Sequence, residues 1–414
     1  MTTTGSLGDL HPFIAIGLEL HSRGHAVTIA SSNFYRPKVE QTGLQFAPMG
    51  PHLDVKISEL MDRVMDLKKG PEYLIRRILY PSVPAAYAEV MDAARNADLI
   101  VTHPITFGAQ IAAEKTGMPW VSTVTAPLSF FSRFDPSVIA SYPFLIKLRA
   151  FGPGFYGAVL KLGRFQTHFW RESINRFRAS IGLPPGRDPL FEGQHSPQRV
   201  LAMFSPVLAE PQADWPAQTV ATGFPFYDQI EHGQGLNPDL LRFLDAGPPP
   251  VVFTLGSSAV YNPGAFYDES RSAIRRLGCR AVLLAGGNLL REPASNGVMV
   301  IPYAPFSAIF PRASVIVHQG GIGTCGQALA AGRPMLVVPF AFDQPDNAER
   351  LQRLGVARTI PRKDYKAKLV DSELERLLCD PNYSAKAAEV PGIIAKENGV
   401  RTASDAIERH LHSQ

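Results

Sequence analysis

At 414 residues the chain is longer than one ordinary domain core, so two domains are expected. A composition of 45% hydrophobic and 19% charged residues is that of a globular protein and excludes a disordered chain. The formal net charge of +4 is small for this length and argues against nucleic acid as the main partner.

The three cysteines (Cys279, Cys325 and Cys379) lack disulfide or metal-site spacing, which predicts a reducing compartment. There is no apolar run of about 18 residues and no signal segment. A cytoplasmic location follows, with peripheral contact at the inner face of a membrane left open. No His, Asp or Cys cluster has ligand spacing, so neither a metal nor another cofactor is expected.

The first half alternates apolar runs with helical patterns. The expected helices cover residues 13–20 and 109–115, and the expected strands cover residues 26–30, 98–102, 120–124 and 200–204. This rhythm predicts a parallel sheet with helices on both faces. Residues 126–198, rich in Phe, Pro, Arg and Leu, interrupt it and are expected to form inserted helices and loops.

The second half restarts the same rhythm. Its expected strands cover residues 251–255, 281–285, 298–301, 315–318 and 335–339. The fold class is therefore α/β, with two Rossmann-like doubly wound parallel-sheet domains facing across a ligand-binding cleft. The expected boundaries are residues 1–225, a linker over 226–238, residues 239–395, and a C-terminal helix over 396–414. Whether that helix packs back on the first domain is left open.

Residues 314–332 read as a strand, a glycine-rich turn and an alanine-rich helix. Glycines at 320, 321 and 323 let the backbone approach a ligand, and a helix that starts near Thr324 directs its free N–H groups at the turn. This pattern predicts a phosphate site. Gly321, Gly323 and Gly326 also spell the dinucleotide fingerprint, so a nicotinamide or flavin oxidoreductase is the alternative. His318 favours a diphosphate leaving group, because an imidazole can donate a hydrogen bond to it.

Two further segments carry candidate site residues. Asp343 and Gln344 follow a strand, where a carboxylate and an amide are able to hold sugar hydroxyls; alternatively Asp343 caps the next helix. Residues 5–12 form a second glycine loop that enters a helix, with Asp9 and His11 as general-base or capping candidates. Few residues precede this loop, so either its strand is very short or the natural chain starts upstream of Met1.

Together these segments resemble a GT-B glycosyltransferase of UDP-glycosyltransferase family 1, which includes plant secondary-product, sterol and macrolide sugar transferases. Residues 303–347 resemble the family's donor-binding box. The similarity is greatest to the bacterial rhamnolipid-type rhamnosyltransferase and sterol glucosyltransferase branch, where the box begins with a histidine and a Gly-Gly-x-Gly turn. Residues 195–198, 212–216 and 222–225 also resemble that rhamnosyltransferase.

The resemblance implies a role for each matching residue. Tyr303, followed by Ala304, falls where an aromatic ring stacks on the donor's base, and His318 falls on the histidine that binds the diphosphate. The phosphates would meet the turn at Gly320, Gly321, Gly323 and Thr324, and the sugar hydroxyls would meet Asp343 and Gln344. Gly256 and Ser257 fall on a second loop that lines the donor site. Asp9, preceded by Gly8, falls on the catalytic base position.

Two departures from the plant members are informative. A ribose-binding glutamate is replaced by Gly326, which leaves both UDP-sugars and dTDP-sugars open as donors. The aspartate that orients the base histidine is replaced by His103, so Asp9 and His103 form either an exchanged dyad or a coincidental pair.

The sequence thus predicts an inverting glycosyltransferase that moves a hexose from a nucleotide diphosphate sugar, of UDP-glucose or dTDP-rhamnose type, to a hydroxyl of an apolar acceptor. The acceptor is expected to be lipid, sterol-like or phenolic, because residues 126–170 are rich in Phe, with Lys147, Arg149 and Lys161 among them. These aromatics could line an acceptor pocket, lie on a membrane surface, or form outer core. A lectin-like binder without catalysis is a further alternative.

Overall fold

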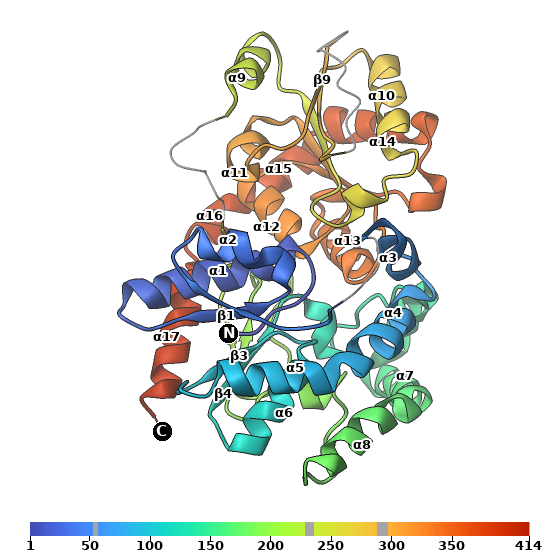
Figure 1. Ribbon diagram of the computed structural model, residues 1–414. Coiled ribbons are helices and arrows are strands. Elements are labelled where there is room, and N and C mark those ends of the chain that lie inside the picture. The colour runs from blue at the N-terminus through green and yellow to red at the C-terminus, as the bar shows by residue number, and fades with distance from the viewer. Residues whose placement is uncertain (53–56, 228–235, 288–296, 414) are drawn as a thin grey trace. The chain divides into compact units, whose positions relative to one another are not determined.

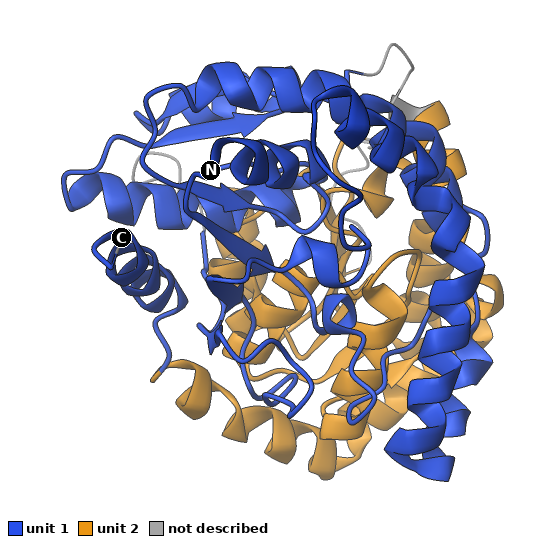
Figure 2. Ribbon diagram, turned by 90° about the horizontal axis from the view of Figure 1, so that it is seen from below, with its two compact units in different colours: residues 1–55, 68–227, 397–414 blue, residues 56–67, 228–396 orange. Residues whose placement is uncertain are grey.

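The computed structural model describes residues 1–52, 57–227, 236–287 and 297–413 (Figure 1). The chain divides into two compact units (Figure 2). Unit 1 comprises residues 1–55, 68–227 and 397–414, and unit 2 comprises residues 56–67 and 228–396. Each unit is built on parallel strands flanked by helices, which is the expected fold class.

The strands of unit 1 are all parallel to their neighbours. They are β1 (Thr28–Ser31), β2 (Gln45–Pro48), β3 (Ile100–Thr102), β4 (Trp120–Val124), β5 (Arg199–Ala202) and β6 (Thr219–Ala221). Thr2 bridges to Ala30 of β1 and to Thr102 of β3, which gives the order β2-β1-Thr2-β3-β4-β5-β6. The strand expected before the first glycine loop is thus reduced to one bridging residue. The order changes direction between Thr2 and β3, and this point is the topological switch point of unit 1.

The helices of unit 1 flank this sheet. They are α1 (Leu7–Ser22), α2 (Arg36–Glu40), α4 (Gly70–Tyr73), α5 (Tyr80–Ala93), α6 (Phe107–Thr116), α7 (Gly152–Thr167), α8 (Glu172–Ser180) and α17 (Gly399–Leu411), with a π-helical segment over Leu74–Leu79. Apolar residues of α1 recur at the helical spacing of Leu10, Phe13 and Ile14 and lie in the core with Val101 and Val121 of the sheet. The core therefore fixes α1 directly beside the switch point.

Two segments belong to a unit far from their neighbours in sequence. α17 packs on α1, where Ala403 and Ile407 enter the same core and Arg23 pairs with Asp405 and Glu408 at 2.7 and 2.6 Å. α3 (Ile57–Val64) lies within the stretch that the sequence assigns to the first domain, but it belongs to unit 2. There Asn262 Nδ2 donates to Asp62 at 2.6 Å. Sequence periodicity carries no signal for such an exchange, because it specifies a helix and not the unit on which that helix packs.

Unit 2 has a six-stranded parallel sheet in the order β12-β11-β10-β7-β8-β9. Its strands are β7 (Val251–Thr254), β8 (Ala281–Leu284), β9 (Val298–Ile301), β10 (Val315–His318), β11 (Met335–Val337) and β12 (Ala357–Thr359). Its remaining helices are α9 (Pro238–Asp245), α10 (Phe266–Leu277), α11 (Phe306–Ile309), α12 (Ile322–Ala331), α13 (Gln344–Leu354), α14 (Ala367–Cys379), α15 (Pro381–Glu389) and α16 (Pro391–Ile394). The switch point of this sheet lies between β7 and β10.

Three strands were not expected from the sequence: β2, β6 and β12. Each has three or four residues and lies at an edge of its sheet, with side chains that are partly exposed in β2 and β6. Edge strands need no continuous apolar run, so they lack the pattern that identifies buried strands. Part of the predicted linker, residues 228–235, lies outside the described residues. No helix in the described ranges has the length and apolarity needed to cross a bilayer.

Candidate active site

Asp9 is positioned by the first turn of α1 in unit 1. Ser6 is the N-cap residue, and Asp9 is the third helical residue, N3. Asp9 Oδ2 accepts hydrogen bonds from the Ser6 backbone N–H at 2.7 Å and from the Ser6 hydroxyl at 3.1 Å. This is a capping box, so one carboxylate oxygen performs the capping role that the sequence left open.

The other oxygen of Asp9 faces His103. Asp9 Oδ1 lies 3.2 Å from His103 Nε2, and His103 directly follows β3, so the pair lies at the switch point of unit 1. The Ile105 N–H donates to His103 Nδ1 at 3.4 Å, which leaves Nε2 to carry the ring proton and donate to Asp9. The Asp9 side chain is 28% exposed and that of His103 only 5%. Asp9 is therefore the member of the pair that an acceptor can reach.

The environment of Asp9 favours its ionised form. Burial by itself raises the pKa of this carboxyl. The hydrogen bond from His103, together with the two Ser6 donors, outweighs burial and holds the pKa below its ordinary value. Asp9 is thus a carboxylate at neutral pH, as a proton acceptor must be.

Gly5 provides the space that the Asp9 carboxylate occupies. Its φ is +125°, and a Cβ at this position would lie 2.3 Å from Asp9 Oδ2. Its carbonyl also accepts a hydrogen bond from the Tyr35 hydroxyl at 3.0 Å. Gly8 makes a different contribution, since its N–H donates to Ser6 Oγ at 3.2 Å. Gly5 was not among the predicted site residues, and its signal in the sequence is a glycine at a strand-to-helix turn.

His11 is a neutral imidazole set apart from that pair. Burial, and secondarily the charge of Lys38, lowers its pKa to about 4. Its ring meets Tyr227 edge-on at 5.2 Å between centroids, and its Nε2 is buried without a hydrogen-bond partner. His11 remains a predicted base candidate, with a ring that can accept a proton but is not aligned by a carboxylate.

In unit 2 the loops after β7 and β10 meet at the switch point. Gly256 has φ of +62°, and a Cβ there would lie 2.3 Å from Gln319 Nε2. A Cβ on Gly321 would lie 2.8 Å from the same nitrogen. The Gln319 side chain thus fills the space beside both loops, and its Oε1 is buried without a partner. Sequence reasoning passed over Gln319, although it stands between the predicted residues His318 and Gly320. Ser257 follows Gly256 in the first of these loops and is partly buried.

His318 ends β10 and is fully buried. Its Nδ1 accepts the Gly320 N–H at 3.0 Å, so the proton of the neutral ring is on Nε2. Burial lowers the pKa of the ring to about 3, which keeps it neutral. Nε2 is buried without a hydrogen-bond partner. An unpaired donor of this kind is costly and suits an anionic oxygen that reaches it after neighbouring side chains move.

The glycine turn presents the start of α12. Gly320 has φ of +90°, and a Cβ there would lie 2.9 Å from Val337 Cγ1 and 3.1 Å from the Gln344 carbonyl oxygen. Gly321 is the N-cap residue of α12, which has neither a side-chain cap nor an acidic residue in its first turn. Gly323 is exposed with open space beside it, and Thr324 is buried. The first N–H groups of α12 therefore have no side chain competing for them.

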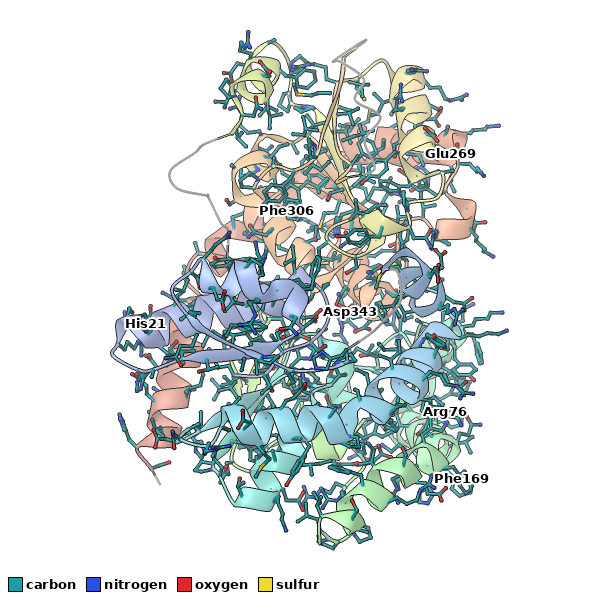
Figure 3. The ribbon with its side chains drawn as sticks, viewed as in Figure 1. His21, Arg76, Phe169, Glu269, Phe306 and Asp343 are labelled. Carbon is teal, nitrogen blue, oxygen red and sulfur yellow. The ribbon has the colours of Figure 1, made fainter. Side chains whose placement is uncertain are left out.

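Asp343, labelled in Figure 3, is tied to this turn through a residue that the sequence did not indicate. Asn347 Nδ2 donates to Asp343 Oδ2 at 2.7 Å and to the Gly320 carbonyl at 2.9 Å. Asp343 occupies the N-cap position of α13 without making a side-chain cap. The residue before it, Phe342, has φ of +58°, a strained conformation typical of functional turns.

Gln344 is more constrained than the sequence implied. Its Oε1 accepts the backbone N–H groups of Phe340 at 2.8 Å and Ala341 at 3.1 Å, and the residue is 5% exposed. The Nε2 donor remains the group available to a sugar.

Tyr303 lies on the surface: 60% of it is exposed after edge strand β9, while the following Ala304 is buried. No group of three or more His, Cys, Asp or Glu side chains among the described residues could hold a metal ion.

The predicted residues therefore form two groups. In unit 1, Asp9 and His103 are in contact and His11 is separate. In unit 2, hydrogen bonds connect His318 to Gly320, Gly320 to Asn347, and Asn347 to Asp343. Each group lies where the strand order of its sheet reverses, which is where open α/β sheets bind ligands.

Comparison with known proteins places the chain. Residues 1–129 match the glycosyltransferase family 28 N-terminal domain, and residues 288–400 match the erythromycin biosynthesis protein CIII-like C-terminal domain. The chain is 32% identical to an O-mycaminosyltylonolide 6-deoxyallosyltransferase of Streptomyces fradiae, over 99% of this chain and 96% of the relative. It is 27% identical to a sterol 3-beta-glucosyltransferase of Arabidopsis thaliana, over 98% of this chain and 67% of that enzyme.

Solved structures show the same fold. The kitacinnamycin glycotransferase superposes with a TM-score of 0.70 at 23% identity, over 99% of this chain and 98% of that one. The glycosyltransferase VinC, solved in complex with dTDP, superposes with a TM-score of 0.69 at 21% identity, over 100% and 99% of the two chains. None of these matches supports the nicotinamide or flavin alternative.

Proposed function

This chain belongs to the GT-B glycosyltransferases of family 1 type, and we propose that it is an inverting enzyme that moves a hexose from a nucleotide diphosphate sugar to a hydroxyl of an apolar acceptor. The observation that carries the proposal is the hydrogen-bonded chain from His318 through Gly320 and Asn347 to Asp343. It joins a group suited to a diphosphate with a group suited to a sugar.

The donor's diphosphate is assigned to the start of α12. Its free N–H groups and the positive end of the helix dipole suit phosphate oxygens, and no carboxylate in the first turn opposes them. His318 Nε2–H supplies a further donor to the oxygen that gains charge as the glycosidic bond breaks. Asp343 and the Gln344 amide nitrogen are assigned to the sugar hydroxyls, and the exposed Tyr303 ring to the base.

The chemical step is assigned to Asp9. Asp9 takes the proton of the acceptor hydroxyl as that oxygen bonds to the anomeric carbon. The bond from the anomeric carbon to the diphosphate breaks, and its electron pair leaves with the nucleoside diphosphate. Attack from the face opposite the leaving group inverts the anomeric centre. His103 acts as a positioning residue that holds the carboxylate through Nε2.

The donor nucleotide is proposed from the residue at position 326, and the acceptor is proposed from the related enzymes. Gly326 offers no carboxylate for the ribose hydroxyls, which leaves room for a dTDP-sugar as well as a UDP-sugar. Two of the related transferases are named for O-mycaminosyltylonolide and for sterols. We therefore assign this chain a polycyclic, macrocyclic or long-chain alcohol or a phenol as acceptor.

The test measures binding and turnover separately. Purified protein is offered dTDP, UDP and NAD, and the shift in melting temperature is recorded for each. We expect stabilisation by a pyrimidine nucleoside diphosphate, no response to NAD, and slow release of free sugar from the intact donor. Saturable binding of NADH, with no binding of dTDP or UDP, would contradict the proposal. Transfer to hydrophilic sugars alone would contradict the acceptor class.

A further inference from the structure

The inserted segment of unit 1 divides its aromatic residues between core and surface. Phe130 and Tyr156 are buried at 8% and 1% exposure. Most of the others are exposed, on α7 and on the 3-10 helices before it (Pro143–Phe151) and after it (His168–Arg171). The exposed apolar side chains are Tyr142, Phe144, Phe151, Phe155, Leu162, Phe165 and Phe169, at 49–72% exposure. We name this set, with the neighbouring exposed residues Lys147, Arg149 and Lys161, the aromatic-basic face.

Helix α7 directs its large apolar residues outward. At about 100° per residue, Phe155, Leu162 and Phe165 fall within a stripe roughly 80° wide. The exposed residues of α7 recur on that same side, while Tyr156 on another side is buried. A surface helix of a soluble domain normally buries its apolar stripe, and here the stripe is turned to solvent. The exposure therefore calls for a partner that is itself apolar.

The part of the inserted segment that carries these side chains is basic. Residues 136–171 contain five Lys and Arg residues and no Asp or Glu, and they are bordered by Asp135 and Glu172. Arg164 pairs with Glu192. Lys147, Arg149 and Lys161 are exposed. Arg76, labelled in Figure 3, lies over the Trp170 ring at 5.7 Å, but its ion pair with Glu72 at 2.6 Å balances its charge. Aromatic side chains bordered by cations are the composition of a helix that lies in the interface of an anionic bilayer.

We propose that the aromatic-basic face docks unit 1 onto an anionic lipid bilayer, with Phe155, Leu162 and Phe165 entering the headgroup region. A second copy of the chain fits this face less well, because a two-fold contact would set the same cations against one another. The proposal does not depend on the proposed glycosyl transfer.

The experiment is sedimentation of the full chain with vesicles, measured without donor or acceptor. One vesicle is phosphatidylcholine alone and the other contains about 30% phosphatidylglycerol, which supplies the negative surface potential. We expect binding to the anionic vesicle at least tenfold tighter than to the neutral one. The triple variant Phe155→Ser, Leu162→Ser, Phe165→Ser should lose at least tenfold. Lys147→Gln with Lys161→Gln should lose about fivefold for each charge removed.

The matched control removes three exposed apolar residues of unit 2: Leu241→Ser, Leu378→Ser and Ile393→Ser. It should bind vesicles as the parent does. The melting temperature should be unchanged in all of these variants, which separates lipid docking from loss of the fold. Failure of the parent to bind anionic vesicles, or unchanged binding by the triple variant, would overturn the proposal. Self-association that the triple variant abolishes, with no vesicle binding, would mark the face as a protein interface and overturn it as well.

Discussion

The switch points of the two units share one backbone arrangement but differ at the N-terminus of the helix that follows. In each, a strand leads through glycines into a helix at the point where the strand order reverses. Helix α1 carries Asp9 at its third position and closes its own N-terminus with a capping box. Helix α12 carries Thr324 at the equivalent position and has no side-chain cap. Two positions, the N-cap and the third helical residue, thus distinguish a helix start closed by its own side chains from one left open, because Ser6 and Asp9 accept hydrogen bonds that Gly321 and Thr324 leave to other acceptors.

The largest expected effect comes from removing the charge of Asp9, at the N-terminus of α1 that the capping box closes. Asp9→Asn keeps an oxygen for the Ser6 N–H but loses the proton acceptor, so turnover should fall by about 10²–10⁴-fold with donor affinity unchanged. His11→Ala should lose much less, and His103→Ala should fall between the two. Turnover and donor affinity are measured for all three variants. If Asp9→Asn turns over normally while His11→Ala is inactive, His11 is the base and Asp9 serves only as a helix cap.

A second variant displaces the Asp9 carboxylate without removing it, and so tests whether its position matters for turnover. Gly5→Ala places a Cβ 2.3 Å from Asp9 Oδ2 and should reduce turnover by about 10²-fold, the scale of a misplacement near 1 Å. Gly24→Ala is the control, since Gly24 has a similar positive φ of +96° with open space beside it. Both variants carry backbone strain, and only Gly5→Ala moves Asp9. Equal losses of turnover would show that strain is responsible rather than the carboxylate position.

At the open helix end, His318→Ala should weaken donor binding by about 1.5–3 kcal/mol, the contribution of a hydrogen bond to a charged group. The control is His195→Ala in unit 1, because His195 is a half-buried imidazole with a pKa lowered to about 4 and a buried Nδ1 without a hydrogen-bond partner. Calorimetric affinity for dTDP or UDP and the melting temperature are compared for both. Full donor affinity in His318→Ala would remove the diphosphate role.

The smallest effect is expected at Gln344. Gln344→Ala removes the amide donor together with the oxygen that accepts from Phe340 and Ala341, and it adds no charge. Use of the intact donor should weaken by about 0.5–1.5 kcal/mol, with little change in affinity for bare nucleotide. If Gln344→Ala weakens both ligands equally, the side chain is structural and takes no part in holding the sugar.

The sequence identified some of the candidate site residues and missed others. The glycine turn with His318 and the pair Asp343 and Gln344 stand in short continuous segments, so local pattern was enough to single them out. Gln319 and Asn347 carry no comparable signal, although Asn347 connects Asp343 to Gly320. Their importance depends on which side chains a strand end and a helix start bring together.

By itself the sequence determined the α/β class, the buried strands and the glycine turns, because apolar runs and glycines act through local backbone and burial preferences. Only the tertiary structure decided the edge strands β2, β6 and β12, which are defined by their neighbours. It also decided that α17 joins the core of unit 1 while α3 joins unit 2. The sequence offered Asp9 both as a helix cap and as a partner of His103. Only the tertiary structure decided that one carboxylate oxygen serves each role, since this requires two residues 94 positions apart to meet at one switch point.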